Sequence, residues 1–506
     1  MAPCRPNARH AAPPELARWL LPLALAFAHP ARGQASPPTA PAADITSAET
    51  ARRRAALAAR LDSGVVVAFG GRTLVHDFTT FFQLPAFRYL TELNEPDAVL
   101  VMVVRGRQAA STLFLAPIEP RMALYYGTRT EPATSLARTG IAGRPLAALA
   151  GVLDSLAGTG LPFYDIPDVE TMDFAANDTL TRGQQAMKGL ARRFPALTVR
   201  DGMRHVLALR ARKSPAELAL IRAAAAISSE GHRAAMLAAN PQHEFEVRAA
   251  LEYEFTRRGA ERPAYGSIVG AGINGTTLHY MKASAPVGPN DLVLVDAAAE
   301  YRGYAADITR TFPASGRYTP EQRAIYQLVR DAQDAAERRS QPGMSVRAAA
   351  DSSVAVRARG LQRLGLIDSV DALIDPPWRT DCASNPGPCR QSYLWMIHGI
   401  SHGIGLAVHD PLQGVGRDAT FQVGDAFTIE PGIYISTRAL DMLPDTPRNR
   451  AFKARVRPIV QRYENTGVRI EDDYVITDQG LERISLVPRE IDEIEALMAR
   501  RRPIQP

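Results

Sequence analysis

The segment 291–312, DLVLVDAAAEYRGYAADITRTF, constrains the fold of this chain more than any other. An apolar run at 292–295 ends in Asp296, and a second run returns through Asp307. A hairpin tip at 301–302 would set these two acids directly opposite each other, with Cβ atoms ~5 Å apart. Two carboxylates that close repel each other unless a cation lies between them. A metal ion is one such cation, although a surface hairpin with two unrelated acids also fits the segment.

Three of the chain's ten histidines fall in one short segment, 397–410, IHGISHGIGLAVHD. His398 and His402 are four residues apart, which on a helix would suggest a metal-binding pair. The glycines beside them argue against a helix. The segment therefore predicts a glycine-rich loop passing into a strand, in which the two histidines need not share a metal.

Two further acids interrupt apolar strands. Glu430 ends the run FTIE before Pro-Gly, and Glu471 stands inside VRIEDDYVI. Each alone is typical of an edge-strand charge, but four carboxylates with one imidazole suit a pair of borderline-hard ions such as Mn²⁺, Co²⁺ or Zn²⁺. Two such ions ~3.5–4 Å apart can hold a bridging hydroxide and polarise a carbonyl. The predicted metal ligands are Asp296, Asp307, His402, Glu430 and Glu471.

Composition excludes several other classes of function. The chain has 506 residues, which favours two or three domains, and its 46% hydrophobic and 22% charged residues are those of a globular protein. The net charge of +6 comes without a clustered basic patch, so nucleic-acid binding is not expected. The sequence contains no P-loop, dinucleotide fingerprint or serine-hydrolase elbow.

Residues 1–35 have the layout of a secretory signal peptide. Arginines precede a short apolar core at 19–28, and small residues near Ala35 offer a cleavage site. The core is about half the ~20 residues that a membrane-spanning helix needs. We therefore expect a periplasmic or secreted protein with no membrane span after cleavage. Residues 36–49, rich in Pro, Ala, Ser and Thr, read as a flexible linker, with order beginning near Arg52.

Cys382 and Cys389 are the two cysteines left after signal cleavage. They flank ASNPGP, which forces a turn between them. In an oxidising compartment a loop disulfide is favoured, and a zinc pair is the alternative. The short loop limits the stabilisation by such a bridge to ~2–3 kcal/mol.

The rest of the chain divides into two regions. Strand-like runs alternate with helical patterns over about 50–210, which predicts an α/β domain. A helix, signalled by a capping box at Ser214, runs to about Ala239, and a second, signalled at Thr319, runs to Arg339. Mixed helices and antiparallel strands predict an α+β domain over 211–495.

At these motifs the sequence resembles the pita-bread metallopeptidases, and most of all their bacterial Xaa-Pro aminopeptidase (aminopeptidase P) branch. FRYLTELNEPDAVLVM is similar to that branch's N-terminal domain. The run from NGTTLHY through HGISHGIGLAVHD, TIEPGIY and VRIEDDYVIT follows the family's motif order. The resemblance implies an α/β N-terminal domain plus an α+β pita-bread (creatinase/aminopeptidase-like) catalytic domain. Relative to the family pattern, the cysteine-bearing loop and the stretch 437–464 are longer.

The resemblance also implies roles for individual residues. Asp296 would bind one metal ion, and Asp307 and Glu471 would bridge both. His402 and Glu430 would complete the second site, with Glu430 also carrying the proton of the attacking water. The residues implied around the substrate are His279, His398, His409 and Arg469.

The activity implied is hydrolysis of the Xaa-Pro bond at the N-terminus of peptides by a metal-bridging hydroxide, with two divalent ions and Mn²⁺ favoured. The partners expected are peptides with proline at the second position and further copies of the chain in a dimer or tetramer. A prolidase acting on Xaa-Pro dipeptides is the alternative. A non-catalytic peptide- or protein-binding module is a minor one, because this fold is reused for binding after ligand loss.

Overall fold

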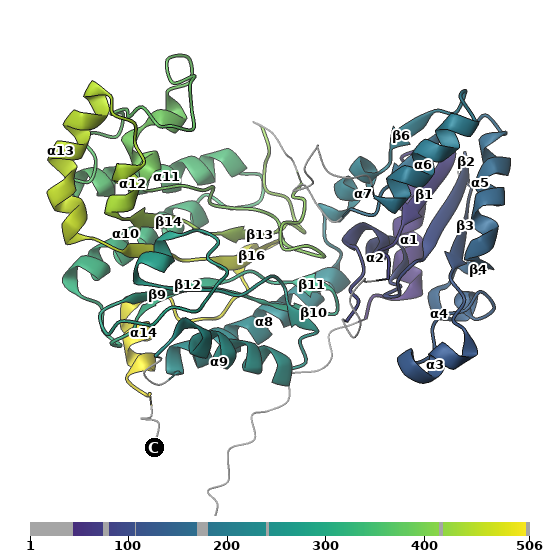
Figure 1. Cartoon of the computed structure of the whole chain (residues 1–506), viewed down its shortest axis with the longest axis horizontal. Coiled ribbons are helices and arrows are strands. Elements are labelled where there is room, and N and C mark those ends of the chain that lie inside the picture. The colour runs from purple at the N-terminus through teal and green to yellow at the C-terminus, as the bar shows by residue number, and fades with distance from the viewer. Residues whose placement is uncertain are drawn as a thin grey trace, which may run out of the picture. The chain divides into compact units, whose positions relative to one another are not determined.

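The computed structural model describes residues 44–73, 80–106, 108–169, 181–238, 242–413 and 418–501 (Figure 1). The predicted signal peptide and most of the predicted linker lie outside the described residues. Within these ranges, none of the helices combines the length and the apolar character needed to cross a membrane.

A six-stranded mixed sheet, in the order β4-β3-β2-β1-β5-β6, forms the core of the N-terminal region. Its central strand β1 is antiparallel to β2 and parallel to β5. The strands are β1 (Ser63–Phe69), β2 (Val99–Arg105), β3 (Gln108–Leu115), β4 (Ala142–Pro145), β5 (Phe163–Ile166) and β6 (Val199–Asp201). The helices are α1 (Ser47–Ala58), α2 (Pro85–Thr91), α3 (Pro120–Tyr126), α4 (Ser135–Thr139), α5 (Leu149–Ala157), α6 (Arg182–Arg193) and α7 (Met203–Arg210), with the short η1 (Leu146–Ala148).

Strand β1 is an almost continuous apolar run because both of its faces are covered. Val65 and Val67 pack with residues of α5 and α6, whereas Val66 and Ala68 pack with residues of α1 and α2. Successive side chains of a strand point to opposite faces, so a strand covered on both sides loses the alternation of apolar and polar residues. The alternation of strands and helices predicted for this region is present.

The first helix begins earlier than predicted. Thr46 caps it, since its hydroxyl accepts a hydrogen bond from the Glu49 N–H at 3.2 Å. Regular structure thus starts at Ser47, so order begins before Arg52 and the last residues of the predicted linker are helical. The polar, alanine-rich sequence there gave no apolar signal for a boundary, and the cap alone sets it.

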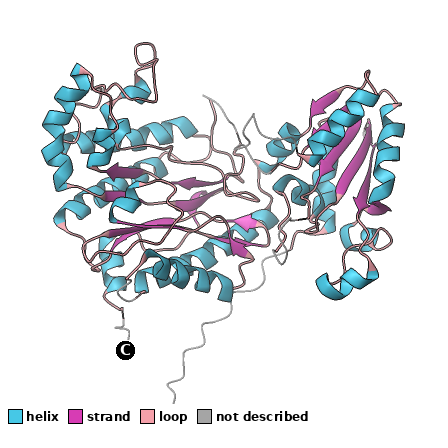
Figure 2. Ribbon diagram, viewed as in Figure 1, coloured by secondary structure: helices cyan, strands magenta, loops and turns pink. Residues whose placement is uncertain are grey.

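The region after α7 is α+β, with small antiparallel sheets between two helix pairs (Figures 1 and 2). Helices α8 and α9 contact each other and the strands β8, β10 and β11, while α10 and α11 contact each other and α10 lies on β13–β15. The helices are α8 (Pro215–Leu237), α9 (Glu244–Arg257), α10 (Pro320–Glu337), α11 (Val346–Arg363), α12 (Thr437–Asp441), α13 (Pro447–Arg462) and α14 (Ile491–Met498). The short helices are η2 (Gly272–Thr276), η3 (Gly387–Cys389) and η4 (Gln391–Leu394). The strands are β7 (Arg262–Pro263), β8 (Ile268–Ala271), β9 (Leu292–Asp296), β10 (Ala299–Tyr301), β11 (Tyr304–Ala305), β12 (Thr309–Pro313), β13 (Ala426–Ile429), β14 (Gly432–Ile435), β15 (Thr466–Arg469), β16 (Asp472–Thr477) and β17 (Gly480–Arg483).

Both helices predicted from capping boxes are present. The Ser214 hydroxyl accepts from the Glu217 N–H, and the Glu217 carboxylate accepts from the Ser214 N–H, at the start of α8. Thr319 and Gln322 do the same for α10. The helices end two residues before the predicted ends, which is the ordinary uncertainty of helix boundaries.

The turn of the 291–312 hairpin differs from the prediction. Tyr301 pairs with Tyr304, so Arg302 and Gly303 form the turn rather than 301–302. Both turn residues have positive φ, 50° and 83°, the geometry of a two-residue hairpin turn that glycine favours. Each residue of the first strand therefore pairs with a residue two positions later than predicted.

Candidate metal centre

The shifted register places Asp296 opposite Thr309, not opposite Asp307 as predicted. Asp307 precedes β12 by two residues, in the irregular stretch between β11 and β12. A residue two places from a cross-strand partner lies on the same face of the sheet. The two acids are therefore diagonal neighbours, and the Tyr265 hydroxyl donates to Oδ1 of both, at 2.6 Å to Asp296.

Thr309 also brings in the acid of a second sheet. Its carbonyl accepts from the Glu471 N–H at 3.0 Å, and its hydroxyl donates to Glu471 Oε2 at 2.7 Å. Glu471 lies between β15 and β16, and its side chain is buried. Glu430 lies between β13 and β14. The four carboxylates thus lie at or close to strand ends, as predicted for Asp296 and Glu430, whereas the sequence patterns placed Asp307 and Glu471 inside strands.

His402 completes the group from a loop. Its backbone is held against β13, where the Thr428 N–H donates to the His402 carbonyl at 2.9 Å. Its Nε2 lies 3.4 Å from Asp307 Oδ2 and 3.7 Å from carboxylate oxygens of both Glu430 and Glu471. The glycine-rich loop is confirmed, but the predicted strand after it is wrong, because the segment makes only single bridges at Gly403.

The geometry of this cluster fits divalent cations. Ligand atoms of Asp307, His402 and Glu471 all lie within 4.8 Å of one another. The His402 Nδ1 lies 3.1 Å from the Gly403 carbonyl, which can only accept, so Nδ1 carries a proton and Nε2 is the ring nitrogen that faces the acids. A backbone carbonyl that fixes the tautomer in this way is typical of a metal-binding histidine.

The charges of the cluster point the same way. Burial raises the pKa of Glu430 to about 8, and the charge of Glu471 adds to this effect. Burial and the Glu471 charge likewise raise the pKa of Asp307 well above its ordinary range. Burial opposes the charged form of His402, but hydrogen bonds to Asp307 and Glu471 outweigh it and raise the pKa of that imidazole. The cluster therefore holds more negative charge than its protein surroundings neutralise, and it attracts positive charge.

Arg469 is a fixed cation beside these acids. Its guanidinium is buried, and it donates to Asp296 Oδ2, to the Tyr434 hydroxyl at 2.7 Å and to the Thr309 hydroxyl at 3.0 Å. The predicted pairing of Arg469 with the acids is thus present. Because Asp296 already has this partner, its carboxylate is held in one orientation toward the cluster.

Of the three further histidines predicted near the substrate, His398 lies closest to the acids. Its Nδ1 is 3.4 Å from Glu430 Oε2, and its Nε2 is 2.8 Å from the Tyr434 hydroxyl. Burial, together with the charges of Arg469 and Arg357, lowers the pKa of His398 to about 3. The imidazole is therefore neutral over the physiological range of pH.

The other two histidines are exposed. His409 is exposed, and its ring packs edge-on against His402, with ring centroids 4.4 Å apart. His279 is exposed in the turn after η2, the short helix that packs against β15. Among the described residues, no hydrogen bond or ion pair joins His279 to the four acids.

Three participants were missed by sequence reasoning. Tyr265 bridges the two aspartates, Thr309 links the two sheets, and Arg357 of α11 donates to the Gly432 carbonyl at 3.0 Å. Tyr265 and Arg357 lie outside the acid and histidine motifs, and a lone tyrosine or arginine carries no spacing signal. Of the three, only Thr309 could have been predicted from strand register, because it lies two residues after Asp307 and therefore on the same face.

Carboxylates near strand ends surround one histidine whose tautomer is fixed, all within an α+β domain. This arrangement is that of a protein class suited to metal-dependent hydrolysis. Comparison with known proteins agrees. Residues 219–478 match the model of Metallopeptidase family M24, and residues 50–160 match that of the Aminopeptidase P, N-terminal domain. The chain belongs to Metallopeptidase family M24.

One curated relative and one solved structure each cover 90% of this chain. The Xaa-Pro aminopeptidase of Escherichia coli K12 is 32% identical over 90% of this chain and 98% of its own length. A structure of Zn-substituted E. coli aminopeptidase P in complex with product is 30% identical, with a TM-score of 0.74, and covers 90% of this chain and 99% of that one. The human Xaa-Pro dipeptidase is 33% identical, but over 57% of this chain and 60% of its own length.

Proposed function

We propose that this chain is an aminopeptidase that hydrolyses the Xaa-Pro bond at the N-terminus of peptides with two divalent metal ions. The observation that carries the proposal is the donor set formed by four carboxylates near strand ends and one loop histidine: Asp296, Asp307, His402, Glu430 and Glu471. Relatives named Xaa-Pro aminopeptidase support the substrate class, because the one from Escherichia coli K12 matches 90% of this chain. The prolidase alternative is weaker, since the dipeptidase relative matches little more than half of the chain.

The ligand roles follow the family pattern. Asp296 would hold one ion, His402 and Glu430 would hold the other, and Asp307 and Glu471 would serve both. When bound, the two ions lower the pKa of water toward neutrality and polarise the scissile carbonyl. The excess negative charge of the acids and the tautomer of His402 both support these roles.

The protein's own groups manage the protons and the substrate. Glu430 accepts the proton of the attacking water and delivers it to the prolyl nitrogen that leaves. His398 is neutral, and either His409 or His398 supplies an N–H donor for the oxyanion that develops on the carbonyl oxygen. Arg469 holds Asp296 and Tyr434 in place, and His279 lines the substrate's approach.

Three finer assignments belong to the same proposal. The ions are Mn²⁺, since an oxygen-rich donor set with one imidazole suits this borderline-hard metal. The protein reaches the periplasm or the exterior through the leader 1–35, and the Cys382–Cys389 disulfide is in keeping with an oxidising compartment. It works as a homo-oligomer.

A substrate panel tests the proposal. Purified mature protein, loaded separately with Mn²⁺, Co²⁺ or Zn²⁺, is offered Ala-Pro, Ala-Pro-Ala and Ala-Pro-Ala-Ala-Ala, with Ala-Ala-Ala as the control peptide. We expect release of the first alanine from the tripeptide and pentapeptide, with Mn²⁺ most effective and Ala-Ala-Ala left intact. Cleavage confined to Ala-Pro would replace the proposal with a prolidase, and no turnover with any metal would overturn it.

A further inference from the structure

A pocket of about 390 Å³ opens beside the segment that carries His398. Its volume lies within the range of small-ligand pockets. The lining is apolar and aromatic apart from one arginine: Trp378, Arg379, Pro388, Tyr393, Met396 and Ile397. Trp378 is 50% exposed and Ile397 is 47% exposed, so apolar surface remains open to solvent there.

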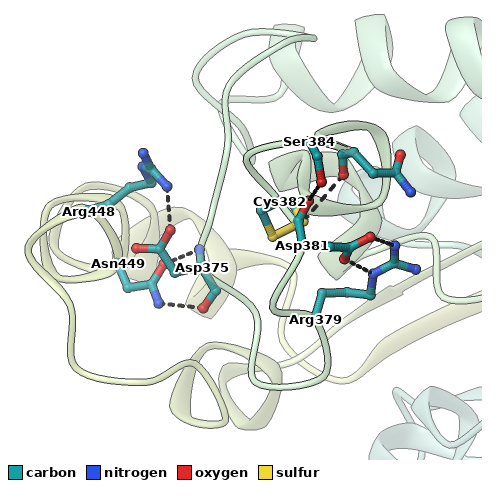
Figure 3. Close-up of a disulfide and its surroundings, with 9 residues drawn as sticks. Asp375, Arg379, Asp381, Cys382, Ser384, Arg448 and Asn449 are labelled. Carbon is teal, nitrogen blue, oxygen red and sulfur yellow. Dashed lines mark hydrogen bonds and ion pairs between the residues drawn. A yellow bond between two sulfur atoms is a disulfide. The ribbon is translucent and has the colours of Figure 1, made fainter.

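The outer wall of the pocket is fixed covalently. The predicted disulfide between Cys382 and Cys389 is present, with Cα atoms 5.8 Å apart, in the loop that contributes Trp378, Arg379 and Pro388 (Figure 3). The Arg379 guanidinium forms a two-point ion pair with Asp381, at 2.8 and 2.6 Å. The charge of Arg379 is therefore already balanced within the loop, and the pocket favours an apolar occupant.

Asp375, which precedes this loop, is hydrogen-bonded to α13 (Figure 3). The Asp375 N–H donates to Asn449 Oδ1 at 3.0 Å, and Asn449 Nδ2 donates back to the Asp375 carbonyl at 2.9 Å. The Asp375 carboxylate also accepts from the Thr446 hydroxyl at 2.6 Å and pairs with Arg448. The two stretches that are longer than the family pattern thus hold each other, and one of them builds the pocket.

The inner wall of the pocket is continuous with the candidate active site. The Tyr434 N–H donates to the Trp395 carbonyl at 3.0 Å, which holds the segment 395–398 along β14. From this segment the His398 ring turns inward to Glu430 and to the Tyr434 hydroxyl, while the neighbouring Ile397 lines the pocket. One short piece of chain therefore separates the pocket from the acids.

We propose that this pocket binds an apolar side chain of the substrate peptide, downstream of the proline. The inference rests on the proposed function. An aminopeptidase holds a single residue on the amino side of the cleaved bond, so only the carboxyl side of a peptide can extend from the metal centre to a pocket open at the rim. An extended peptide advances about 3.3 Å per residue, and the pocket is assigned to the side chain at position 3, 4 or 5.

The test compares pentapeptides that differ in one position. Ala-Pro-Ala-Ala-Ala is the reference, and phenylalanine replaces alanine at position 3, 4 or 5 in turn. For each peptide kcat/KM is measured with the Mn²⁺-loaded enzyme, and the result is the ratio to the reference. We expect one phenylalanine peptide to be preferred roughly tenfold, since burying an aromatic ring is worth at least this factor.

The variants locate the preference. Trp378→Ala should bring the ratio close to one, and Trp378→Phe should restore most of it. Leu486→Ala is the matched control, because Leu486 is 61% exposed outside the pocket, and it should keep the wild-type ratio. A ratio taken within each variant is unaffected by differences in active fraction.

The outcomes separate the two proposals. If the reference peptide is cleaved but no phenylalanine peptide is preferred, or if Trp378→Ala keeps the preference, the subsite is overturned and the proposed function stands. If no Xaa-Pro peptide is cleaved by the wild type, the proposed function is overturned and the subsite with it. Only a preference that Trp378→Ala removes and Leu486→Ala keeps supports the subsite.

Discussion

At the scale of single residues, Glu430 is proposed to have two roles, as a metal ligand and as the group that carries the proton of the attacking water. Glu430→Gln keeps the size of the side chain but removes its basic oxygen. We expect kcat to fall by roughly 10²–10⁴-fold, the usual contribution of a general base, while the protein stays folded. Steady-state kinetics on Ala-Pro-Ala, with circular dichroism for folding, measure both.

Glu482→Gln is the control for this change, because Glu482 is a partly exposed acid paired with Arg222 away from the cluster. It should leave kcat within about twofold, as expected for a surface pair. A Glu430→Gln enzyme with near wild-type kcat would remove Glu430 from the proton path.

The raised pKa values also predict how the metal-free protein responds to pH. Folded Glu430 has a pKa of about 8 against an ordinary 4.5, so between these values the folded state binds more protons than the unfolded state. Folding stability contributed by this group is then lost as pH rises. The raised pKa of His402 acts in the same direction.

We therefore expect the melting temperature of the metal-stripped protein to fall from pH 5 to pH 8, as measured by differential scanning fluorimetry. Glu430→Gln should flatten the curve, since glutamine does not titrate. The Mn²⁺-loaded protein should not show the fall, because bound cations replace the protons. A melting temperature of the stripped protein that rises over this window contradicts the electrostatic account of the cluster.

At the scale of elements, sequence reasoning did best where the signal was local. The capping boxes at Ser214 and Thr319 fixed two helix starts, because a cap depends on residues three positions apart. The hairpin register was wrong because it depends on which two residues take positive φ, and Gly303 was counted on the wrong side of the turn. A shift of that kind changes the partner of every later residue.

A close contact between elements predicts one stability effect. A Cβ on Gly467 of β15 would lie 2.0 Å from the Gly275 carbonyl oxygen of η2, which is backbone and cannot turn aside. Gly467→Ala should destabilise the protein by about 1–3 kcal/mol or more, and it should lower activity because β15 carries Arg469. Urea unfolding measures the first effect.

Gly151→Ala is the matched glycine control. Gly151 lies in α5, and a Cβ there meets nothing within 4 Å. Alanine in a helix interior is favoured over glycine by roughly 0.5–1 kcal/mol, so this variant should be slightly more stable than the wild type. If the two variants had the same stability, β15 and η2 would not be packed as closely as described.

At the scale of the whole molecule, the connection between the two regions reaches the histidine loop. Arg210 ends α7, Lys213 precedes α8, and both pair with the buried Asp410, whose second oxygen lies 3.2 Å from Lys213 Nζ. Asp410 directly follows His409. Asp410→Asn should cost about 3–5 kcal/mol, because it leaves two buried cations without their counter-ion.

The exposed pair of Asp445 and Arg450 gives the comparison for that change. Asp445→Asn should alter the free energy of unfolding by no more than about 0.5 kcal/mol. Denaturant unfolding measures the free energy of unfolding of both variants. If both lose the same small amount of stability, the Asp410 contacts do not hold the histidine loop.

Asp296 and Glu430 could be singled out from the sequence because each ends an apolar strand, and the other proposed ligands because they stand in family motifs. Their spatial arrangement could not. Tyr265 lies 31 positions from its partner Asp296, and Thr309 lies 162 positions from its partner Glu471. Such contacts follow from strand pairing that no local pattern encodes. The pocket at Trp378 was equally out of reach, since it forms only when the disulfide loop meets the segment before His398.

The most direct test of the two-metal cage counts ions and activity together. Metal-stripped protein is titrated with Mn²⁺, bound metal is measured by mass spectrometry after desalting, and hydrolysis of Ala-Pro-Ala is followed in the same samples. The predicted result is two ions per chain at full activity, with Glu471→Gln unable to hold the pair. Full activity in the stripped protein, or two ions bound without hydrolysis of the Xaa-Pro bond, would contradict it.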